Sequence, residues 1–317
     1  MQSIEFCAGA GGQALGLEQA GFRHSALVEI EPDFAATLRL NRPQWDVHTA
    51  DMNSFDGRPF EGTDLFAAGL PCPPFSMAGK QLGERDERNL FPAAIRLIDE
   101  IRPKAVMIEN VRGFLSAIFE DYRGQLKSQL NKLGYTVDWR LLNASDFGVP
   151  QLRPRVVIVA IRKDLADAFD WPVVHTQKPP SVGDTLRDLM AENGWGGAHK
   201  WADQAQAIAP TIVGGSKKHG GPDLGPTRAR KAWADLGVEG KSLFNEAPGP
   251  DFVGIPRLTV RMVARIQGFP DDWQFFGKKT SSYRQVGNAF PPPVAKAIAN
   301  KIKIALGAQK MFSVKAA

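Results

Sequence analysis

The sequence predicts an α/β fold, a doubly wound mixed sheet with helices on both faces, together with a smaller second domain. Three observations predict it. In the first 160 residues, short apolar runs alternate with segments of helical periodicity. A glycine-rich turn, Ala8–Gly12, follows the first apolar run. After about Ile161 the alternation ends, and Gly and Pro become frequent, most of all in residues 213–226.

Each element follows from its own pattern of apolar residues. The expected strands are Gln2–Cys7, Ser25–Glu29, Asp46–Thr49, Leu65–Gly69, Ala105–Glu109, Tyr135–Asn143 and Val156–Ile161. The expected helices are Gly12–Gly21, Asp33–Asn41, Phe91–Ile101, Tyr122–Leu133, Thr259–Ile266 and Pro293–Leu306. Because only a short connection joins the last two strands, we expect the far edge of the sheet to be antiparallel.

Composition places the chain among ordinary globular proteins. Its 317 residues are 43% hydrophobic and 23% charged. No apolar run approaches the ~18 residues that span a membrane, and the start of the chain lacks the basic region of a signal peptide. The cysteines are Cys7 and Cys72, too few for a disulfide framework and without a Cys/His cluster that would bind zinc. We therefore expect a cytoplasmic protein without a metal.

The positive charge is unevenly distributed. The net charge is +5, and residues 196–265 hold ten Lys or Arg against six Asp or Glu. Such a segment is either a solvated face or the binding surface for a polyanion.

Cys72 lies in the segment Gly69–Ser76, directly after an apolar run. The prolines around it restrict the backbone, and open α/β sheets bind ligands at the carboxyl ends of their strands. Taken alone, Cys72 is either a reactive thiol or an inert buried cysteine.

Two further groups of polar residues lie at predicted strand ends. Glu109 ends one apolar run, and Arg153 and Arg155 precede another. Residues at i and i+2 of an extended segment share a face, so the two guanidinium groups would share one face if this segment is extended. With Cys72 they provide a nucleophile, an acid/base and a cationic clamp; a surface ion pair is the alternative.

Two acidic residues lie beside the glycine turn. Glu29 ends the second expected strand, where a carboxylate binds ribose hydroxyls, and Asp51 follows the third, where it can accept from an adenine amino group. An exposed strand end and a helix cap are the respective alternatives.

In order and spacing, these motifs resemble those of the C5-cytosine DNA methyltransferases. The matching segments are Phe6–Gly12, Pro71-Cys72, Glu109-Asn110-Val111, Gln151–Arg155, Arg257–Trp273 and Gln285–Asn288. Two positions differ, since Cys7 stands where the family often has Phe and Pro73 where it often has Gln. The resemblance implies an S-adenosylmethionine-dependent, Rossmann-like catalytic domain and a smaller target-recognition domain.

The resemblance also implies catalytic roles. Cys72 would attack cytosine C6, Glu109 would hold and protonate N3, Arg155 would contact O2, and Arg153 would support them. The base would be flipped out of the duplex.

Cofactor and DNA contacts follow from the same motifs. The implied cofactor residues are Cys7, Ala8, Gly9, Ala10, Gly11, Gly12, Glu29, Ile30, Asp51, Met52, Pro71, Leu90, Asn288 and Ala289. The implied DNA contacts are Ser76, Lys80 and Arg88 on a loop over the DNA, and Lys217, Lys218, Arg228, Arg230 and Lys231 in the recognition loop Val213–Lys231.

The sequence therefore predicts a DNA (cytosine-5-)-methyltransferase acting on double-stranded DNA in the bacterial cytoplasm. We expect residues 1–165 to form the catalytic domain, 166–275 the target-recognition domain, and 276–317 to return to the first. The enzyme would either act alone or protect DNA in a restriction system, in which a restriction endonuclease would act on the same site without contacting it. A tRNA cytosine-5 methyltransferase and an inactive DNA-binding relative are the alternatives; the Asp/Asn-Pro-Pro-Tyr motif of amino-methylating enzymes is absent.

Overall fold

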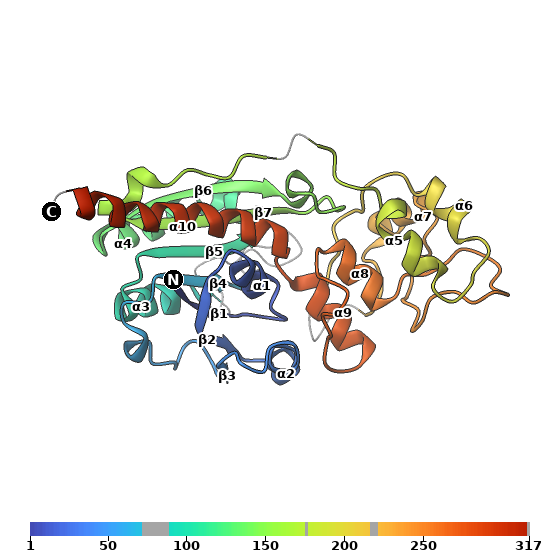
Figure 1. Ribbon diagram of the computed structural model, residues 1–317, viewed down its shortest axis with the longest axis horizontal. Coiled ribbons are helices and arrows are strands. Elements are labelled where there is room, and N and C mark those ends of the chain that lie inside the picture. Colours follow the sequence, from blue (N-terminus) through green and yellow to red (C-terminus); the bar gives the residue numbers. More distant parts are fainter. Residues whose placement is uncertain (72–88, 175–176, 216–220, 316–317) are drawn as a thin grey trace. The chain divides into compact units, whose positions relative to one another are not determined.

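The computed structural model describes residues 1–71, 89–174, 177–215 and 221–315. Six predicted site residues lie outside this part: Cys72, Ser76, Lys80, Arg88, Lys217 and Lys218. Packing divides the chain into two compact units (Figure 1). Unit 1 comprises Met1–Leu142, Pro154–Val173 and Val294–Ala317, and unit 2 comprises Asn143–Arg153 and Val174–Pro293.

Unit 1 is built on a seven-stranded sheet with the order β3-β2-β1-β4-β5-β7-β6. The strands are β1 (Gln2–Phe6), β2 (Arg23–Glu29), β3 (Val47–Thr49), β4 (Leu65–Gly69), β5 (Ala105–Val111), β6 (Tyr135–Asn143) and β7 (Pro154–Arg162). From β3 to β5 all neighbours are parallel, whereas β7 runs antiparallel to β5. The predicted mixed sheet and its antiparallel edge are therefore confirmed.

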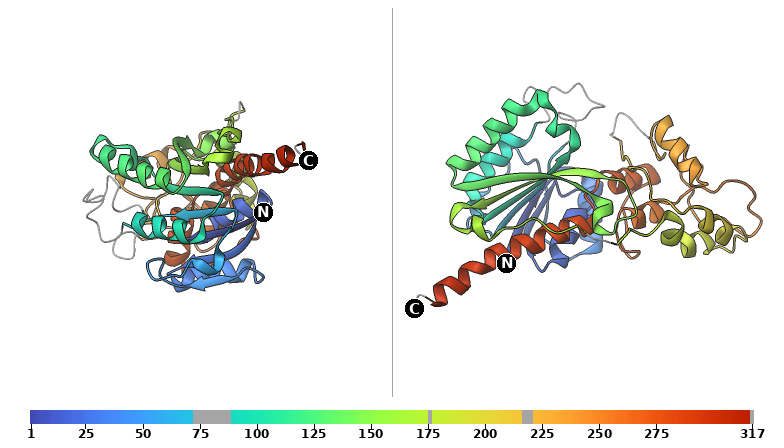
Figure 2. Two further views of the ribbon diagram at one scale, coloured as in Figure 1. Left: turned by 90° about the vertical axis from the view of Figure 1, so that its left-hand side faces the viewer. Right: turned by 90° about the horizontal axis from the view of Figure 1, so that it is seen from above.

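Helices cover both faces of this sheet, as predicted. They are α1 (Gly12–Gln19), α2 (Pro32–Asn41), α3 (Phe91–Ile101), α4 (Glu120–Lys132) and α10 (Pro292–Lys315). α3 and α4 lie over one face, and α1 and α10 over the other (Figure 2). Lys303 Nζ donates to Ala20 O at 2.9 Å and so joins α10 to the end of α1. Short 3₁₀ turns complete the connections: Arg58–Phe60, Arg112–Leu115, Ala117–Phe119, Ala144–Phe147 and Lys163–Ala168.

The main core lies between the sheet and the pair α3 and α4. α3 buries one side, including Leu97, Ile98 and Ile101, against strand residues such as Phe66 and Ile108. Apolar residues three and four apart produce this face. The core holds the carboxyl ends of β4 and β5 in place.

Unit 2 contains α5 (Val182–Ala191), α6 (Ala198–Gln204), α7 (Thr227–Asp235), α8 (Val260–Ile266) and α9 (Lys279–Asn288). Of these, only α8 was predicted. The predicted extent of the loop, Val213–Lys231, is wrong at its C-terminal end, because the residues from Thr227 onward form α7. α7 is anchored by Trp233, which is fully buried, while its other residues are mostly polar, so no apolar period reveals it.

Unit 2 starts and ends at different residues from the expected target-recognition domain, 166–275. The return to unit 1 comes at Val294 rather than at 276. These units are defined by packing, so the recognition role of the second domain stays a prediction. Within the described residues, no helix is both long enough and apolar enough to cross a lipid bilayer.

Candidate active site and cofactor site

Glu109 and Arg155 form an ion pair on neighbouring strands. Arg155 Nε lies 2.8 Å from Glu109 Oε1, and both side chains are largely buried. The antiparallel register sets Arg155 opposite Val111, so Glu109, two residues earlier, projects from the same face of the sheet. The predicted acid/base and cation are therefore brought together by the strands themselves.

The strand β4, which precedes Cys72 in the sequence, pairs with β5, which carries Glu109. In the parallel register of β4 and β5, Gly69 is the partner of Glu109. Leu70 is buried and Pro71 is the last described residue before Cys72. The described strands thus bring the chain to within three residues of Cys72 at the level of Glu109.

Arg153 has other partners than Arg155 does. Its guanidinium is fully buried in unit 2, where it donates to the carbonyl oxygens of Ile212 (2.7 Å), Gly287 (2.7 Å) and Ala289 (3.0 Å). The two guanidinium groups therefore have different partners. Arg153 satisfies backbone carbonyls of distant segments, which points to a structural support.

Two glutamines that were assigned no role complete this buried network. Gln151 Nε2 donates to Gln267 Oε1 at 2.6 Å, and Gln151 Oε1 accepts from Ile212 N at 2.9 Å. Gln267 Nε2 donates to Ala289 O at 2.6 Å. Both side chains are fully buried. In the sequence, the only indication that these two glutamines matter was their position inside the matched segments Gln151–Arg155 and Arg257–Trp273.

The glycine turn connects β1 to α1 through a series of left-handed residues. Cys7, Gly9 and Gly11 have φ of 52°, 57° and 87°, a region that glycine adopts readily and other residues rarely. β1 therefore ends at Phe6 rather than at the predicted Cys7. The turn leads into the first turn of α1, whose backbone amides suit a polar ligand.

Cys7 is suited to packing rather than to attack. Burial, and next the nearby Glu29 carboxyl, raise the pKa of the Cys7 thiol well above its usual range. A thiol with a raised pKa stays protonated at neutral pH and is a poor nucleophile.

Glu29 supports the glycine turn directly. Its Oε2 accepts from Gly9 N at 2.7 Å and its Oε1 from Glu31 N at 2.8 Å. Burial raises the pKa of Glu29, while these two backbone bonds oppose the rise. A carboxylate has about four acceptor positions, so Glu29 can also accept from a ligand.

Asp51 lies in the connection after β3. Its Oδ1 accepts from Asn53 N at 2.8 Å and from Asn53 Nδ2 at 3.0 Å, and Asp51 is exposed. Met52 packs in the core. The exposed carboxylate is thus oriented by a local turn and remains accessible.

The residues present fit an adenosine-containing cofactor. A Cβ added to Gly9 would meet no atom within 4 Å, so there is open space beside the turn. The large apolar side chain of Ile30 is 58% exposed directly after Glu29, and a flat base would cover it. Carboxylates, an apolar side chain and helix amides together match a nucleoside carrying polar groups.

Asn288 and Ala289 belong to unit 2, whereas the other predicted cofactor residues belong to unit 1. Asn288 Nδ2 donates to Gly215 O at 3.2 Å. A Cβ on the preceding Gly287 would lie 2.4 Å from Gly214 Cα. The segments around these two glycines therefore approach so closely that no side chain fits at position 287. The place of Asn288 beside the cofactor stays a prediction.

The predicted DNA cations on α7 differ in exposure. Arg228 and Lys231 are exposed and lie nearly one helical turn apart. Arg230 is partly buried, since a Cβ on Gly240 would lie 3.1 Å from Arg230 Cγ. The aliphatic part of the Arg230 side chain therefore packs against Gly240. The side chains of Arg228 and Lys231 are exposed to solvent.

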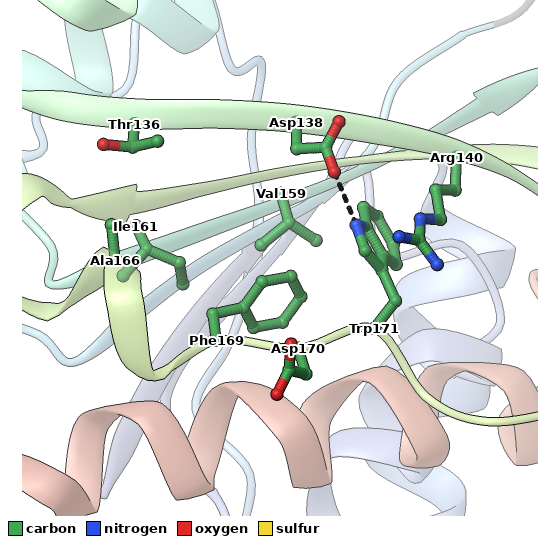
Figure 3. A pocket seen from close by; sticks show the side chains of 9 residues that line it. All are labelled: Thr136, Asp138, Arg140, Val159, Ile161, Ala166, Phe169, Asp170 and Trp171. Atoms are coloured by element: carbon green, nitrogen blue, oxygen red, sulfur yellow. Dashed lines mark hydrogen bonds between the residues drawn. The ribbon is translucent and has the colours of Figure 1, made fainter.

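A separate pocket of about 230 Å³ lies on the outer strands of unit 1. There Trp171 Nε1 donates to Asp138 Oδ2 at 2.7 Å, and the Arg140 guanidinium lies 5.4 Å from the Trp171 ring (Figure 3). None of the predicted site residues lines this pocket. Across the described ranges, no three His, Cys, Asp or Glu side chains form a cluster that could hold a metal ion.

Comparisons with known proteins give the family of this chain. The family model for C-5 cytosine-specific DNA methylases matches residues 1–304. The Type II methyltransferase M.NgoMIV of Neisseria gonorrhoeae is 55% identical over 307 residues, which cover 96% of this chain and 97% of that protein. The Type II methyltransferase M.NaeI of Lentzea aerocolonigenes is 55% identical over 312 residues, covering 96% of this chain and 75% of that protein.

Solved structures share the fold. A DNA modification methyltransferase encoded in an E. coli prophage has a TM-score of 0.70 at 22% identity, covering 97% of this chain and 99% of that one. A DNMT2 variant of Spodoptera frugiperda has a TM-score of 0.65 at 19% identity, covering 96% and 99%. Because the family model spans nearly the whole chain and two relatives share more than half of the aligned residues, the chain belongs to the C-5 cytosine-specific DNA methylases, and the predicted family, fold and enzyme class are confirmed.

Proposed function

We propose that this chain transfers a methyl group from S-adenosylmethionine to C5 of a cytosine flipped out of a specific duplex DNA site, as the modification enzyme of a restriction system. A methyltransferase family implies this methyl donor. The observation that carries the proposal is the Glu109–Arg155 ion pair, one strand away from the segment that leads to Cys72. The Type II methyltransferases at 55% identity support the restriction role.

The proposed catalytic residues would activate cytosine C5 for methyl transfer. Cytosine C5 is a poor nucleophile until a thiolate adds to C6 and N3 accepts a proton. Cys72 would form the bond to C6, Glu109 would hold and protonate N3, and Arg155 would contact O2. When bound, the cofactor supplies an electrophilic methyl group. Loss of the C5 proton to solvent, expulsion of the Cys72 thiolate and return of the N3 proton to the Glu109 carboxylate would then restore the neutral ring.

The cofactor would be held at the glycine turn. Glu29 would accept from the ribose hydroxyls, Asp51 from the adenine amino group, and Ile30 would pack on the base. The turn itself and the neighbouring backbone would line the methionine part. The other proposed cofactor residues are Cys7, Ala8, Gly9, Ala10, Gly11, Gly12, Met52, Pro71, Leu90, Asn288 and Ala289.

DNA would contact the basic residues of unit 2. The exposed cations Arg228 and Lys231 on α7 suit phosphate or a guanine edge. Arg230 suits this less, because its stem packs on Gly240. Lys217 and Lys218 are proposed to bind phosphate, and Ser76, Lys80 and Arg88 to contact DNA near the flipped base.

Trapping tests the proposal directly. Duplex DNA with 5-fluorocytosine at the target should form a denaturation-stable complex with the enzyme and cofactor, because fluorine blocks release of the C5 substituent. Cys72→Ala should form none, and the same duplex with ordinary cytosine should release the enzyme. A complex with Cys72→Ala as abundant as with the parent, or no complex with the parent on methylatable DNA, would refute the assignment.

A further inference from the structure

We propose that Arg96 and Glu100 of α3 are positioning residues that hold the segment Asp51–Gly57, here called the adenine loop, in the conformation that reads the cofactor base. The inference rests on the proposed cofactor site. It assigns a specificity role to two residues that touch neither cofactor nor DNA in that proposal. α3 lies beside this loop, and the two side chains are one helical turn apart.

Arg96 binds the loop through its carbonyl oxygens. Nη1 donates to Phe55 O at 3.1 Å, and Nη2 donates to Met52 O at 3.1 Å and Asn53 O at 3.2 Å. One guanidinium thus reaches three peptide groups within four residues. Its planar fork of donors makes this possible, whereas a lysine ammonium is a single point.

Glu100 completes the clamp from the next turn of α3. Its Oε1 accepts from Arg96 Nη1 at 2.6 Å, which fixes the guanidinium, and its Oε2 accepts from Gly57 N at 2.8 Å. Gly57 is buried, and an added Cβ would lie 2.9 Å from Glu100 Oε2 and 3.0 Å from Leu97 Cδ2. The far end of the adenine loop is therefore seated directly on α3.

The held peptides are the ones that orient Asp51. Asp51 Oδ1 accepts from Asn53 N, and the carbonyls of Met52 and Asn53 are both bound by Arg96. Asp51 is exposed and would otherwise sample several rotamers. Fixing these peptides therefore fixes where its carboxylate can meet an amino group.

Stability alone does not explain this arrangement. An i,i+4 ion pair with 38% and 23% of its side chains exposed contributes little by itself. The loop already packs through Phe55, whose ring lies 5.4 Å from that of Phe6. Arg96 and Glu100 therefore fix the orientation of the peptides in a loop that is already held in place by packing.

The experiment compares two non-reactive ligands by calorimetric titration: S-adenosylhomocysteine and S-inosylhomocysteine, whose base carries oxygen in place of the 6-amino group. The parent should prefer the adenine form. Arg96→Met should bind the adenine form about tenfold more weakly and the inosine form almost unchanged, so the preference disappears. Arg96→Lys and Glu100→Gln should give smaller losses in the same direction, and they carry the test if Arg96→Met does not fold.

Arg123→Met is the matched control. Arg123 also donates to two loop carbonyls, Phe114 O at 2.7 Å and Ser116 O at 2.8 Å, on a loop without a proposed cofactor residue. It should lower the Tm and keep the preference for adenine. Folded Arg96 variants that keep the parental preference, or that weaken both ligands equally, would overturn the inference. A parent that binds neither ligand would instead refute the cofactor site on which the inference rests.

Discussion

Arg155 Nε lies 2.8 Å from Glu109 Oε1 across the antiparallel strands β7 and β5. Both groups sit on strands rather than on loops, so the sheet register sets their separation. The chemistry of the proposed reaction therefore has a rigid base, to which the segment carrying Cys72 is attached through β4.

Glu109→Gln tests the acid/base role. The amide keeps the shape of the side chain but cannot deliver a proton to N3, so we expect the methyl transfer rate to fall about 100-fold or more. Cofactor affinity should stay within about twofold, because Glu109 is not in the proposed cofactor site. Methyl transfer assays with saturating cofactor and calorimetry measure the two effects; a rate near that of the parent would exclude the role.

We predict that Glu29 sets both the strength and the pH dependence of cofactor binding. Losing a hydrogen bond to a charged group costs about 1.5–3 kcal/mol, so Glu29→Ala should bind the cofactor roughly 10- to 150-fold more weakly.

Because burial raises the pKa of Glu29, the carboxylate takes up its proton at a higher pH than an ordinary glutamate does. Affinity should therefore fall as the pH is lowered through this raised pKa, and Glu29→Gln should lack that dependence. Calorimetric titration across the acidic range checks both, and a pH-independent parent would contradict the proposal.

Arg153 should matter for stability. Arg153→Met would remove the Arg153 donor from the carbonyl oxygens of Ile212 and Gly287. Ala289 O would lose one of its two donors and keep Gln267 Nε2. We therefore expect a loss of about 3 kcal/mol in the free energy of unfolding. Arg140→Met, which removes an exposed guanidinium from the Trp171 ring, should cost at most about 1 kcal/mol. Denaturant unfolding compares them, and equal losses would mean that the buried network adds nothing.

His24 should make the fold sensitive to acid. Its Nε2 donates to Ala14 O at 3.1 Å, its Nδ1 accepts from Ser3 Oγ at 3.0 Å, and burial lowers its pKa to about 4. The unfolded chain, with a histidine pKa of about 6.5, binds the proton first. The contribution of His24 is therefore complete above about pH 6.5 and is lost as the pH falls toward 4, by about 1–3 kcal/mol.

Unfolding curves between pH 7 and pH 4 test this. His24→Gln should flatten the slope of stability against pH. A parent whose stability is constant across this range would contradict the buried neutral state of His24.

The α7 cations should separate into two classes. Arg228→Ala and Lys231→Ala should each weaken DNA binding and reduce the salt dependence of the affinity by about one unit of slope if they bind phosphate. Arg230→Ala should have less effect on DNA and more on stability, because its stem packs on Gly240. Fluorescence anisotropy at several salt concentrations distinguishes these outcomes, and equal effects on DNA at all three positions would contradict the division.

The sheet and its edge were predictable because buried strands leave a strong signal. β4 and β6 have the predicted bounds, Leu65–Gly69 and Tyr135–Asn143, and α3 has the predicted span Phe91–Ile101. Long apolar runs and a clear helical period identify such elements without tertiary information. Once the strands and their register are known, the alternation of side chains along a strand also predicts that Glu109 and Arg155 lie on the same face of the sheet.

Among the described helices of unit 2, those other than α8 were not predicted, and the reasons differ from helix to helix. α7 buries little beyond Trp233, so it has no apolar stripe. α5 carried a readable signal in its capping box, in which Ser181 Oγ accepts from Asp184 N at 3.0 Å. The partners of Arg153 lie 59, 134 and 136 residues away along the chain, and no local pattern encodes such contacts.

Identification of the methylated atom tests the central claim most directly. The purified chain, incubated with S-adenosylmethionine and unmethylated plasmid DNA, should produce 5-methylcytosine that nucleoside mass spectrometry detects. Bisulfite sequencing should place it at one cytosine of a single short motif, and Cys72→Ala should produce none. N4-methylcytosine, methylated adenine, or no methylated base at all from the folded parent would contradict the account.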